Sequence, residues 1–280
     1  MTTPASGPFR RLRRAVAQQI PPLRRIIERQ EQLVAERHAL TDQRDHLALL
    51  LRSKRDYLAH HYLRGDGVEI GALHRPLPLP AGVTVRYVDR LPEAELRSQY
   101  PELASEPLVR VDVLDDGETL RTIPDASVDF VIANHFLEHC EDPIGALVTF
   151  ARVLRPQGIA FLAVPDMRQT FDRRRPETTL AHVVRDHDVG PATSRDSHFR
   201  EWATLVENVD GQLTAAQVEE KFQARLTMNY SIHFHAWTPL GLMELVRHVL
   251  TTVRTDLEFI EGALDRDEFL VILRKPAISL

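Results

Sequence analysis

The chain has 280 residues, of which 43% are apolar and 27% are charged, and this composition is typical of a globular protein. No apolar run approaches the ~20 residues of a membrane-spanning helix, and the apolar segment of a secretion signal does not follow the Arg-rich start. A single cysteine, Cys140, excludes an internal disulfide and a multi-cysteine zinc site. We therefore expect a cytoplasmic protein with no transmembrane segment.

The N-terminal part of the chain is basic and is predicted to be helical. Residues 1–58 hold 12 Lys and Arg against 6 Asp and Glu, a net charge of +6, which leaves −11 for the remainder of a chain whose total is −5. This acidic remainder, which has no aromatic and basic platform, argues against a nucleic-acid partner. We expect a flexible tail over residues 1–17 and a long helix over residues 18–63, because residues 23–62 contain neither Pro nor Gly.

Apolar residues recur every seven positions along this predicted helix, at Ile26, Leu33, Leu40 and Leu47. The positions between them that would complete a coiled-coil seam are polar: Gln30, Arg37 and Arg44. The pattern favours a helix that docks on a second surface, and a homodimer through this helix is one possibility that it leaves open.

Residues 64–167 alternate between strand and helix patterns. Short apolar runs without strict alternation are typical of strands buried on both faces of a parallel sheet. Predicted strands cover 68–71, 83–89, 108–114, 128–133 and 159–164, and predicted helices cover 92–103 and 143–154. Strand, helix and strand with short connections form right-handed βαβ units, so this region predicts a doubly wound, mostly parallel α/β sheet.

The alternation lapses over residues 168–236, which we call the cap and expect to cover the acceptor side of a site. The cap contains His182, His187 and the run Arg173-Arg174-Arg175, which has two readings: a phosphate or carboxylate site, or a solvated charged surface. Residues 237–280 are predicted to hold a helix over 239–249 and two strands, 257–260 and 269–273, that close the sheet with an antiparallel strand.

This order of elements resembles that of the class I S-adenosylmethionine-dependent methyltransferases, and five short motifs carry the resemblance. They are Glu69-Ile70-Gly71, Asp89 at the end of a strand, Asp115-Asp116-Gly117, Phe136-Leu137-Glu138-His139 followed by Asp142-Pro143, and Leu154-Arg155-Pro156-Gln157-Gly158. The sequence departs from the family where Gly71 alone stands in place of a three-glycine turn. The resemblance implies a Rossmann-like fold, S-adenosylmethionine as the cofactor and methyl transfer as the activity.

The resemblance also implies where the cofactor binds. Gly71 lets the backbone approach the ligand closely, and Asp89 is placed to accept the ribose hydroxyls, as the acid after the second strand does in dinucleotide sites. Either Asp115 or Asp116 is placed to accept from the adenine amino group. The predicted cofactor-binding residues are Glu69, Gly71, Ala72, Asp89, Arg90, Asp115, Asp116, Asn134 and His135.

Transfer of a methyl group to an oxygen acceptor needs a base, and histidine is suited to that role near neutral pH. The first candidate is His139, followed by His187 and His182, with Glu138 as the residue that orients His139. The predicted acceptor is a hydroxyl of a small molecule or glycan, such as a sugar or a secondary metabolite.

Two alternatives remain open from the sequence. The first is a protein that binds the cofactor without catalysis and works through its N-terminal helix. The second is a metal-dependent enzyme on the same fold, with His135 or His139 and a cap histidine such as His187 or His233 as ligands. His135-Phe136-Leu137-Glu138-His139 also has the H-x-x-E-H spacing of a zinc protease, but its first histidine ends a predicted strand rather than lying on a helix. We therefore assign no metal ligands.

Overall fold

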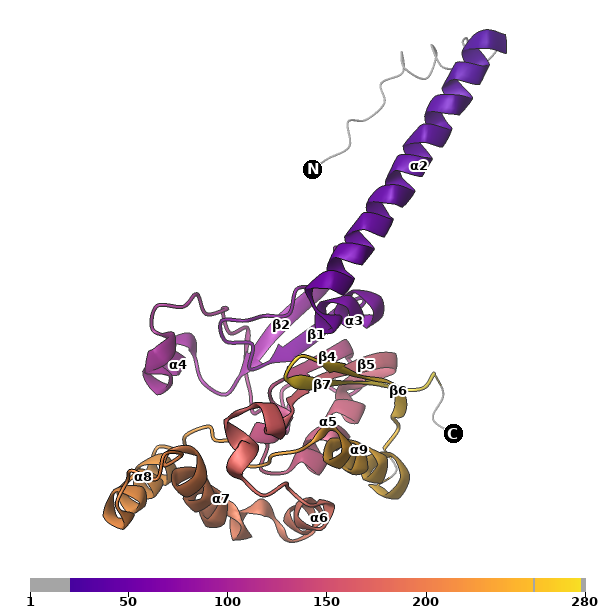
Figure 1. Ribbon diagram of the computed structural model, residues 1–280. Helices are drawn as coiled ribbons and strands as arrows, with labels where there is room; N and C mark the ends of the chain where they lie inside the picture. The colour runs from indigo at the N-terminus through magenta and orange to yellow at the C-terminus, as the bar shows by residue number, and fades with distance from the viewer. Residues whose placement is uncertain (1–20, 254, 278–280) are drawn as a thin grey trace. The chain divides into compact units, whose positions relative to one another are not determined.

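The computed structural model describes residues 21–253 and 255–277, which divide into two compact units at Arg52 and Ser53 (Figure 1). The first unit contains the long helix α2 (Pro21–Arg52), on which the side chains of Ile26, Leu33 and Leu40 are exposed. The predicted tail over residues 1–17 and the side chain of Leu47 lie outside the described part of the chain.

The predicted single helix over residues 18–63 is wrong at its C-terminal end, because it breaks at Ser53. The backbone of Ser53 is extended, and its hydroxyl accepts a hydrogen bond from the amide of Asp56 at 3.0 Å, which starts a separate helix, α3 (Lys54–Tyr62). Serine caps helix N-termini well because its side chain satisfies an amide that has no partner in the first turn. Helix α3 belongs to the second unit, where Leu58 and Ala59 are buried.

The second unit is built on a seven-stranded sheet in the order β3-β2-β1-β4-β5-β7-β6. Strands β1 to β5 run parallel to one another, whereas β7 runs antiparallel to both β5 and β6. The strands are β1 (Asp66–Ile70), β2 (Thr84–Asp89), β3 (Val113–Leu114), β4 (Val128–Asn134), β5 (Leu154–Pro165), β6 (Glu258–Asp265) and β7 (Glu268–Arg274). This confirms the predicted doubly wound, mostly parallel sheet with an antiparallel closing strand.

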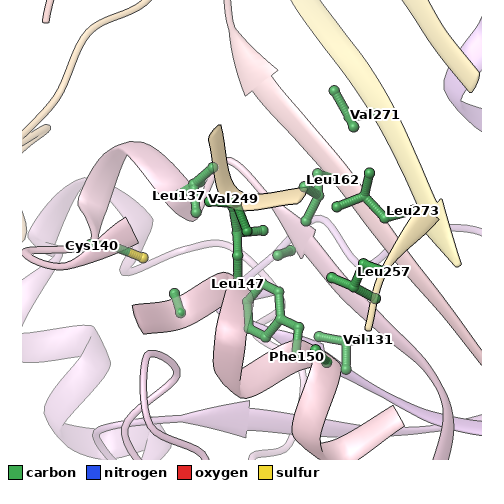
Figure 2. Close-up of a cluster of buried hydrophobic side chains, with 14 of the residues drawn as sticks. Val131, Leu137, Cys140, Leu147, Phe150, Leu162, Val249, Leu257, Val271 and Leu273 are labelled. Atoms are coloured by element: carbon green, nitrogen blue, oxygen red, sulfur yellow. The ribbon is translucent and has the colours of Figure 1, made fainter. Parts of the chain in front are cut away.

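Alternate residues of the central strands pack into two separate cores on the two faces of the sheet, as the period of two in a strand requires. Val131 and Ala133 of β4 pack with α5 (Pro143–Val153) and α9 (Pro239–His248), while Phe130 and Ile132 pack with Leu58 of α3. Figure 1 shows α5 and α9 on one side of the sheet and α3 on the other. Leu147 and Phe150 of α5 lie among the side chains of the larger core in Figure 2.

The cap folds around a small core of its own, formed by Phe199, Trp202, Ala203, Phe222, Ile232 and Phe234. Its helices are α6 (Leu180–Val189), α7 (Arg195–Glu201), continued by the π-helical turn η6 (Trp202–Val206), and α8 (Ala215–Thr227). Shorter helical elements complete the chain: α4 (Glu93–Gln99), η1 (Pro101–Leu103), η2 (Leu137–His139), η3 (Met167–Gln169), η4 (Phe171–Arg174), η5 (Pro191–Thr193) and η7 (Val249–Val253). Within the described residues, no helix has both the length and the apolar character to cross a membrane.

Two shorter predictions are corrected by the structure. The strand expected over residues 108–114 is reduced to the two residues of β3, because it pairs with β2 only at Val88 and Asp89. The Arg173-Arg174-Arg175 run is not uniform, because Arg175 is buried while its two neighbours are exposed. The guanidinium of Arg175 contacts Asp172, Glu201 and the carbonyl of Phe234, so it ties the cap together instead of binding a ligand.

Candidate active site

A cavity of ≈ 320 Å³ lies at the carboxyl ends of the parallel strands. Gly71 follows β1, Asp89 ends β2 and His135 follows β4, and all three line this cavity. The cap contributes the opposite wall through Asn229 to Ser231. Ligands of open α/β sheets bind at this edge, where the strand order reverses between β1 and β4.

The turn after β1 is open where a ligand could approach its backbone. Gly71 has φ +64°, and a Cβ built on it meets no atom within 4 Å. Glu69, predicted to touch the cofactor, does not line the cavity. Its buried carboxylate accepts a hydrogen bond from the amide of Leu77, with N–O distances of 3.0 and 3.2 Å, and burial raises its pKa to about 7. Glu69 therefore holds the loop that follows Gly71 in place. Ala72, which was also predicted to bind the cofactor, does not line the cavity either.

The end of β2 supplies an acidic and a basic residue, Asp89 and Arg90, to the cavity. The carboxylate of Asp89 lines it and accepts from the amide of Leu91 at 3.3 Å, and burial raises the pKa of Asp89 above its usual value. Arg90 also lines the cavity, and its Nη2 donates to the carbonyl of Asn229 at 3.2 Å. This hydrogen bond joins the end of the second strand to the cap at the cavity.

Of the two acids after β3, only Asp116 lines the cavity. Asp115 is turned into its own loop, where one carboxylate oxygen accepts from the amide and the hydroxyl of Thr122 at 2.7 and 2.6 Å. Partial burial alone would raise the pKa of Asp115, but these hydrogen bonds lower it. The structure thereby separates two residues that the sequence left as equal candidates.

Glu118, which sequence reasoning missed, also lines the cavity. Its two carboxylate oxygens accept from the amides of Glu141 and Asp142 at 2.8 and 2.9 Å, and burial raises its pKa to about 7. It fixes the turn that follows His139.

The end of β4 turns sharply, so that His135 rather than Asn134 reaches the cavity. His135 has φ +49°, and its Nε2 lies 2.8 Å from the carboxylate of Glu268. Burial lowers the pKa of His135, but the hydrogen bond to Glu268 and the nearby charge of Glu138 outweigh burial and raise it overall. The amide oxygen of Asn134 is buried without a hydrogen-bond partner.

His139 lines the cavity from η2. Its Nδ1 lies 2.8 Å from the carbonyl oxygen of Ile232 and 3.1 Å from the hydroxyl of Ser231. A carbonyl only accepts, so Nδ1 carries the proton and the neutral ring has its lone pair on Nε2. Burial and the neighbouring His233 lower the pKa of His139 well below its usual value.

Glu138 does not orient His139 as the sequence predicted. Both of its carboxylate oxygens are buried and make no hydrogen bond, and its nearest basic contact is His135 Nδ1 at 3.8 Å. The cap segment holding Ser231 and Ile232 takes over the orienting role. Glu138, His139 and His233 nevertheless have side-chain ligand atoms within 4.8 Å of one another.

The two cap histidines predicted to be catalytic do not line the cavity. His187 Nδ1 lies 3.0 Å from the carboxylate of Asp142, which caps α5. His182 instead contacts His198 and Asp186. Both histidines lie on α6, whose contacts with α5 and with the rest of the cap turn them away from the strand ends.

Several cavity residues come from segments that the sequence gave no reason to bring together. They are Tyr100 after α4, Glu141 after η2, and Asn229, Tyr230, Ser231 and Phe234 in the cap. Ile70, Leu73, Gly117 and Phe136 complete the lining near the strand ends. The rings of Tyr100 and Tyr230 lie 6.1 Å apart, and an ion pair joins Arg195 of the cap to Glu141. In the sequence, the one pattern that could have indicated these cap residues is the polar run Asn229-Tyr230-Ser231 shortly before His233.

Comparison with known proteins agrees with this topology. Residues 67–162 match the methyltransferase-domain family, and no curated protein matches the chain. The fold resembles a candidate zinc-dependent alcohol dehydrogenase of Rhodobacter sphaeroides (TM-score 0.50, 15% identity, 80% of this chain and 90% of that chain). It also resembles an S-adenosylmethionine-dependent methyltransferase of Methanosarcina mazei (TM-score 0.41, 16% identity, 78% of this chain and 97% of that chain). A further similar structure is an S-adenosylmethionine-dependent methyltransferase of Aquifex aeolicus (TM-score 0.40, 11% identity, 75% of this chain and 82% of that chain). At these identities the resemblance concerns the fold alone.

Proposed function

Because the chain carries a class I S-adenosylmethionine-dependent methyltransferase domain, we propose that it methylates a hydroxyl group of a small molecule or glycan. The observation that carries this proposal is the contact of His139 Nδ1 with the carbonyl of Ile232, which leaves Nε2 able to accept a proton from an acceptor hydroxyl. The free, buried thiol of Cys140 agrees with the reducing cytoplasm as the proposed compartment.

The residues around the cavity suit the cofactor. An open glycine turn accommodates the amino-acid part next to Gly71, and Asp89 offers a carboxylate to a pair of ribose hydroxyls. We assign the hydrogen bond from the adenine amino group to the carboxylate of Asp116. The bound cofactor supplies an electrophilic methyl group on a sulfonium.

The protein's own contribution is positioning and proton removal. In-line displacement depends strongly on how the acceptor oxygen is held, and we assign that role to the polar wall formed by Tyr100, Asn229 and Tyr230. His139 then takes the hydroxyl proton on Nε2. Its lowered pKa keeps the imidazole neutral, and therefore competent as a base, throughout the neutral pH range.

A hydroxyl acceptor agrees with the groups that the cap supplies. Asn229, Tyr230 and Ser231 offer amide, phenol and hydroxyl hydrogen-bonding groups, and the aromatic rings of Tyr100 and Tyr230 can pack on the apolar face of a sugar.

The test is transfer of labelled methyl from S-adenosylmethionine to a panel of hydroxyl-bearing sugars, glycosides and phenols, with amines of matched size as the comparison. We expect transfer to hydroxyls and a rate that rises with pH to a plateau, with a midpoint below the usual histidine value of 6.5. His139→Gln should lower kcat about 100- to 10,000-fold and remove this pH dependence, with cofactor affinity retained.

His187→Gln is the matched control, because His187 belongs to the cap but lies outside the cavity lining. Its rate should stay near that of the unchanged chain. Transfer to amines alone, or full activity of His139→Gln, would contradict the proposal.

A further inference from the structure

A group of three histidines and one aspartate lies in the cap, outside the cavity lining. We call it the histidine cluster: His182 and Asp186 on α6, His198 on α7 and His235 on the segment that leads to α9. The three histidines have ligand nitrogens within 4.8 Å of one another. The carboxylate of Asp186 lies 3.1 Å from His182 Nε2 and 3.6 Å from His198 Nε2.

Three of the four residues of the cluster are buried, and the ring of His235 has no hydrogen-bond partner. His235 and Asp186 are each 0% exposed and His198 is 8% exposed. Both ring nitrogens of His235 make no hydrogen bond, and the carboxylate oxygens of Asp186 have no partner other than the neighbouring imidazoles of His182 and His198. Buried polar atoms are almost always satisfied, because leaving one without a partner costs its full desolvation energy. One nitrogen of His235 lies within 4.8 Å of ligand nitrogens of His182 and His198, which indicates a missing partner that binds imidazole nitrogens together with a carboxylate.

The spacing of the cluster matches a tetrahedral metal site. With metal–nitrogen bonds of about 2.0–2.1 Å, two ligand atoms of a tetrahedron lie about 3.3 Å apart. The Nε2 atoms of His182 and His198 are 3.0 Å apart, and the two distances to Asp186 are 3.1 and 3.6 Å.

The distances between the imidazole rings provide a second test of whether the cluster fits a tetrahedral metal site. An imidazole centroid lies about 3.2 Å from a metal bound to its nitrogen, so tetrahedral sites place ring centroids about 5.2 Å apart. The three pairs formed by His182, His198 and His235 have centroid distances of 4.9, 5.8 and 5.3 Å, with interplanar angles of 72°, 67° and 77°. The rings meet edge to face around one point.

We propose that the histidine cluster binds one divalent transition-metal ion, with zinc as the best match, through the three imidazoles and the carboxylate of Asp186. Three nitrogens and one oxygen form a donor set that zinc accepts in four-coordinate sites. Because all four ligands come from the protein, no coordination position is left for water or substrate, as in structural zinc sites.

One contact must change when the metal binds. Arg185 Nη2 lies 2.7 Å from His182 Nδ1 and donates to it, which places the ring proton on Nε2. Ligation through Nε2 moves that proton to Nδ1, so the guanidinium of Arg185 must withdraw. Arg185 is exposed, and the withdrawal exchanges one hydrogen bond for contact with water.

The second group of possible ligands, Glu138, His139 and His233, fits less well. The Nδ1 atoms of its two histidines contact the carbonyl of Ile232 and the carboxylate of Asp172, which leaves each Nε2 able to bind a metal, but the group supplies three ligands against four in the histidine cluster. His139 also faces the cavity, where the proposed function requires it as a free base.

A metal in the histidine cluster would join the cap to η2, the turn that carries Glu138 and His139. It links α6, α7 and His235, whose amide donates to the carbonyl of Glu138 at 3.1 Å, next to His139. The ring of His235 also stacks on Trp237, with centroids 5.2 Å apart. The metal would therefore stabilise the wall that holds Ser231 and Ile232 against His139.

The test is metal analysis of the full-length chain after expression with added zinc and removal of loosely bound ions. We expect about one zinc per chain, displacement by cobalt with the intense visible absorption of a tetrahedral ion, and a melting temperature that falls on chelation and recovers with zinc chloride. His182→Ala and Asp186→Asn should each weaken zinc binding at least about 100-fold. His182 is partly exposed, so its loss should leave the fold intact by circular dichroism.

Two matched controls locate the metal. His187→Ala removes a histidine from the same helix and should retain the ion, and His139→Ala should also retain it. A folded chain that takes up no zinc, cobalt, nickel or manganese would overturn the proposal. So would an ion that is lost in His139→Ala but kept in His182→Ala, because that result would place the metal in the second group. The first outcome leaves the proposed methyl transfer untouched, whereas the second would also remove His139 as the free base; methyl transfer is measured separately.

Discussion

Glu69 is the residue whose position the sequence explains least, since a carboxylate next to the cofactor turn suggests direct contact. The structure instead places it 1% exposed beneath the loop that follows Gly71, with the amide of Leu77 as its hydrogen-bond partner. Burial disfavours its charge and raises its pKa from 4.5 to about 7.

This pKa makes stability depend on pH. A carboxyl whose pKa is higher in the folded chain contributes stability that is fully present below about pH 4.5 and is lost as the pH rises through about 7. Glu69→Gln stays neutral and retains an acceptor for Leu77. We therefore expect it to raise the free energy of unfolding at pH 8.5 by on the order of 3 kcal/mol and to change little at pH 4.5.

Urea unfolding of Glu69→Gln at the two pH values checks this prediction, with Glu106→Gln, an exposed glutamate, as the control. Equal effects of Glu69→Gln at both pH values would contradict it.

At the level of residues, the sequence predicted best what strand ends determine. Gly71, Asp89, Asp116, His135 and His139 all line the cavity, because the carboxyl ends of parallel strands meet at one edge. Tyr100, Glu118 and Tyr230 were missed because they reach the cavity from connections whose paths no periodicity encodes. His182 and His187 were misplaced because the orientation of α6 depends on tertiary packing.

At the level of elements, the cap is held by a buried ion-pair network rather than by apolar packing alone. Arg175 bridges Asp172, on η4, and Glu201, at the end of α7, and His233 also contacts Asp172, at 2.7 Å. Removing one partner of a buried pair leaves a buried charge without compensation, which is much more costly than losing a surface pair.

We expect Arg175→Leu to lower the free energy of unfolding by about 3–5 kcal/mol. Arg173→Leu, at an exposed position two residues earlier, should change it by less than about 0.5 kcal/mol. Chemical denaturation of both variants provides the measurement. A similar small effect at the two positions would mean that the network contributes no net stability.

Helix α2 yields a separate prediction. Ile26, Leu33 and Leu40 expose about half or more of their surface, at 56%, 48% and 65%, and their seven-residue spacing places them along one face of α2. The polar positions between them leave a coiled-coil seam incomplete, and we take a second copy of the chain as the surface on which this face docks. We expect light scattering to report a dimer that becomes a monomer when all three are changed to Gln. Arg37→Gln, on the same helix, should leave the dimer intact. An unchanged mass for the triple variant would contradict self-association through α2.

Element boundaries were predictable only where the chain marks them chemically. Asp142 caps α5 by accepting from the amide of Gly145, and Pro143 follows it, so this start was visible in the sequence. The break at Ser53 was missed, because its only signal is Ser53 followed three residues later by Asp56, a capping pattern that stands here within a continuous run of helix formers. The predicted strand over residues 108–114 has a suitable composition but is paired at only two positions.

At the level of the whole molecule, the topology follows from the order of patterns along the chain. Buried runs separated by helices give parallel strands, and the final hairpin of β6 and β7 inserts β7 antiparallel beside β5. This arrangement creates the edge at which Gly71, Asp89 and Asp116 converge. The proposed function requires that this edge binds the cofactor.

Calorimetric titration of the full-length chain with S-adenosylmethionine and S-adenosylhomocysteine tests this claim most directly. We predict saturable binding at one site per chain. Asp89→Asn should weaken that binding about 10- to 100-fold, the equivalent of losing a charged hydrogen bond. Asp112→Asn, which changes an acid near β2 that does not line the cavity, should bind as the unchanged chain does. Absence of binding by either ligand at millimolar concentration, or full affinity in Asp89→Asn, would contradict the account.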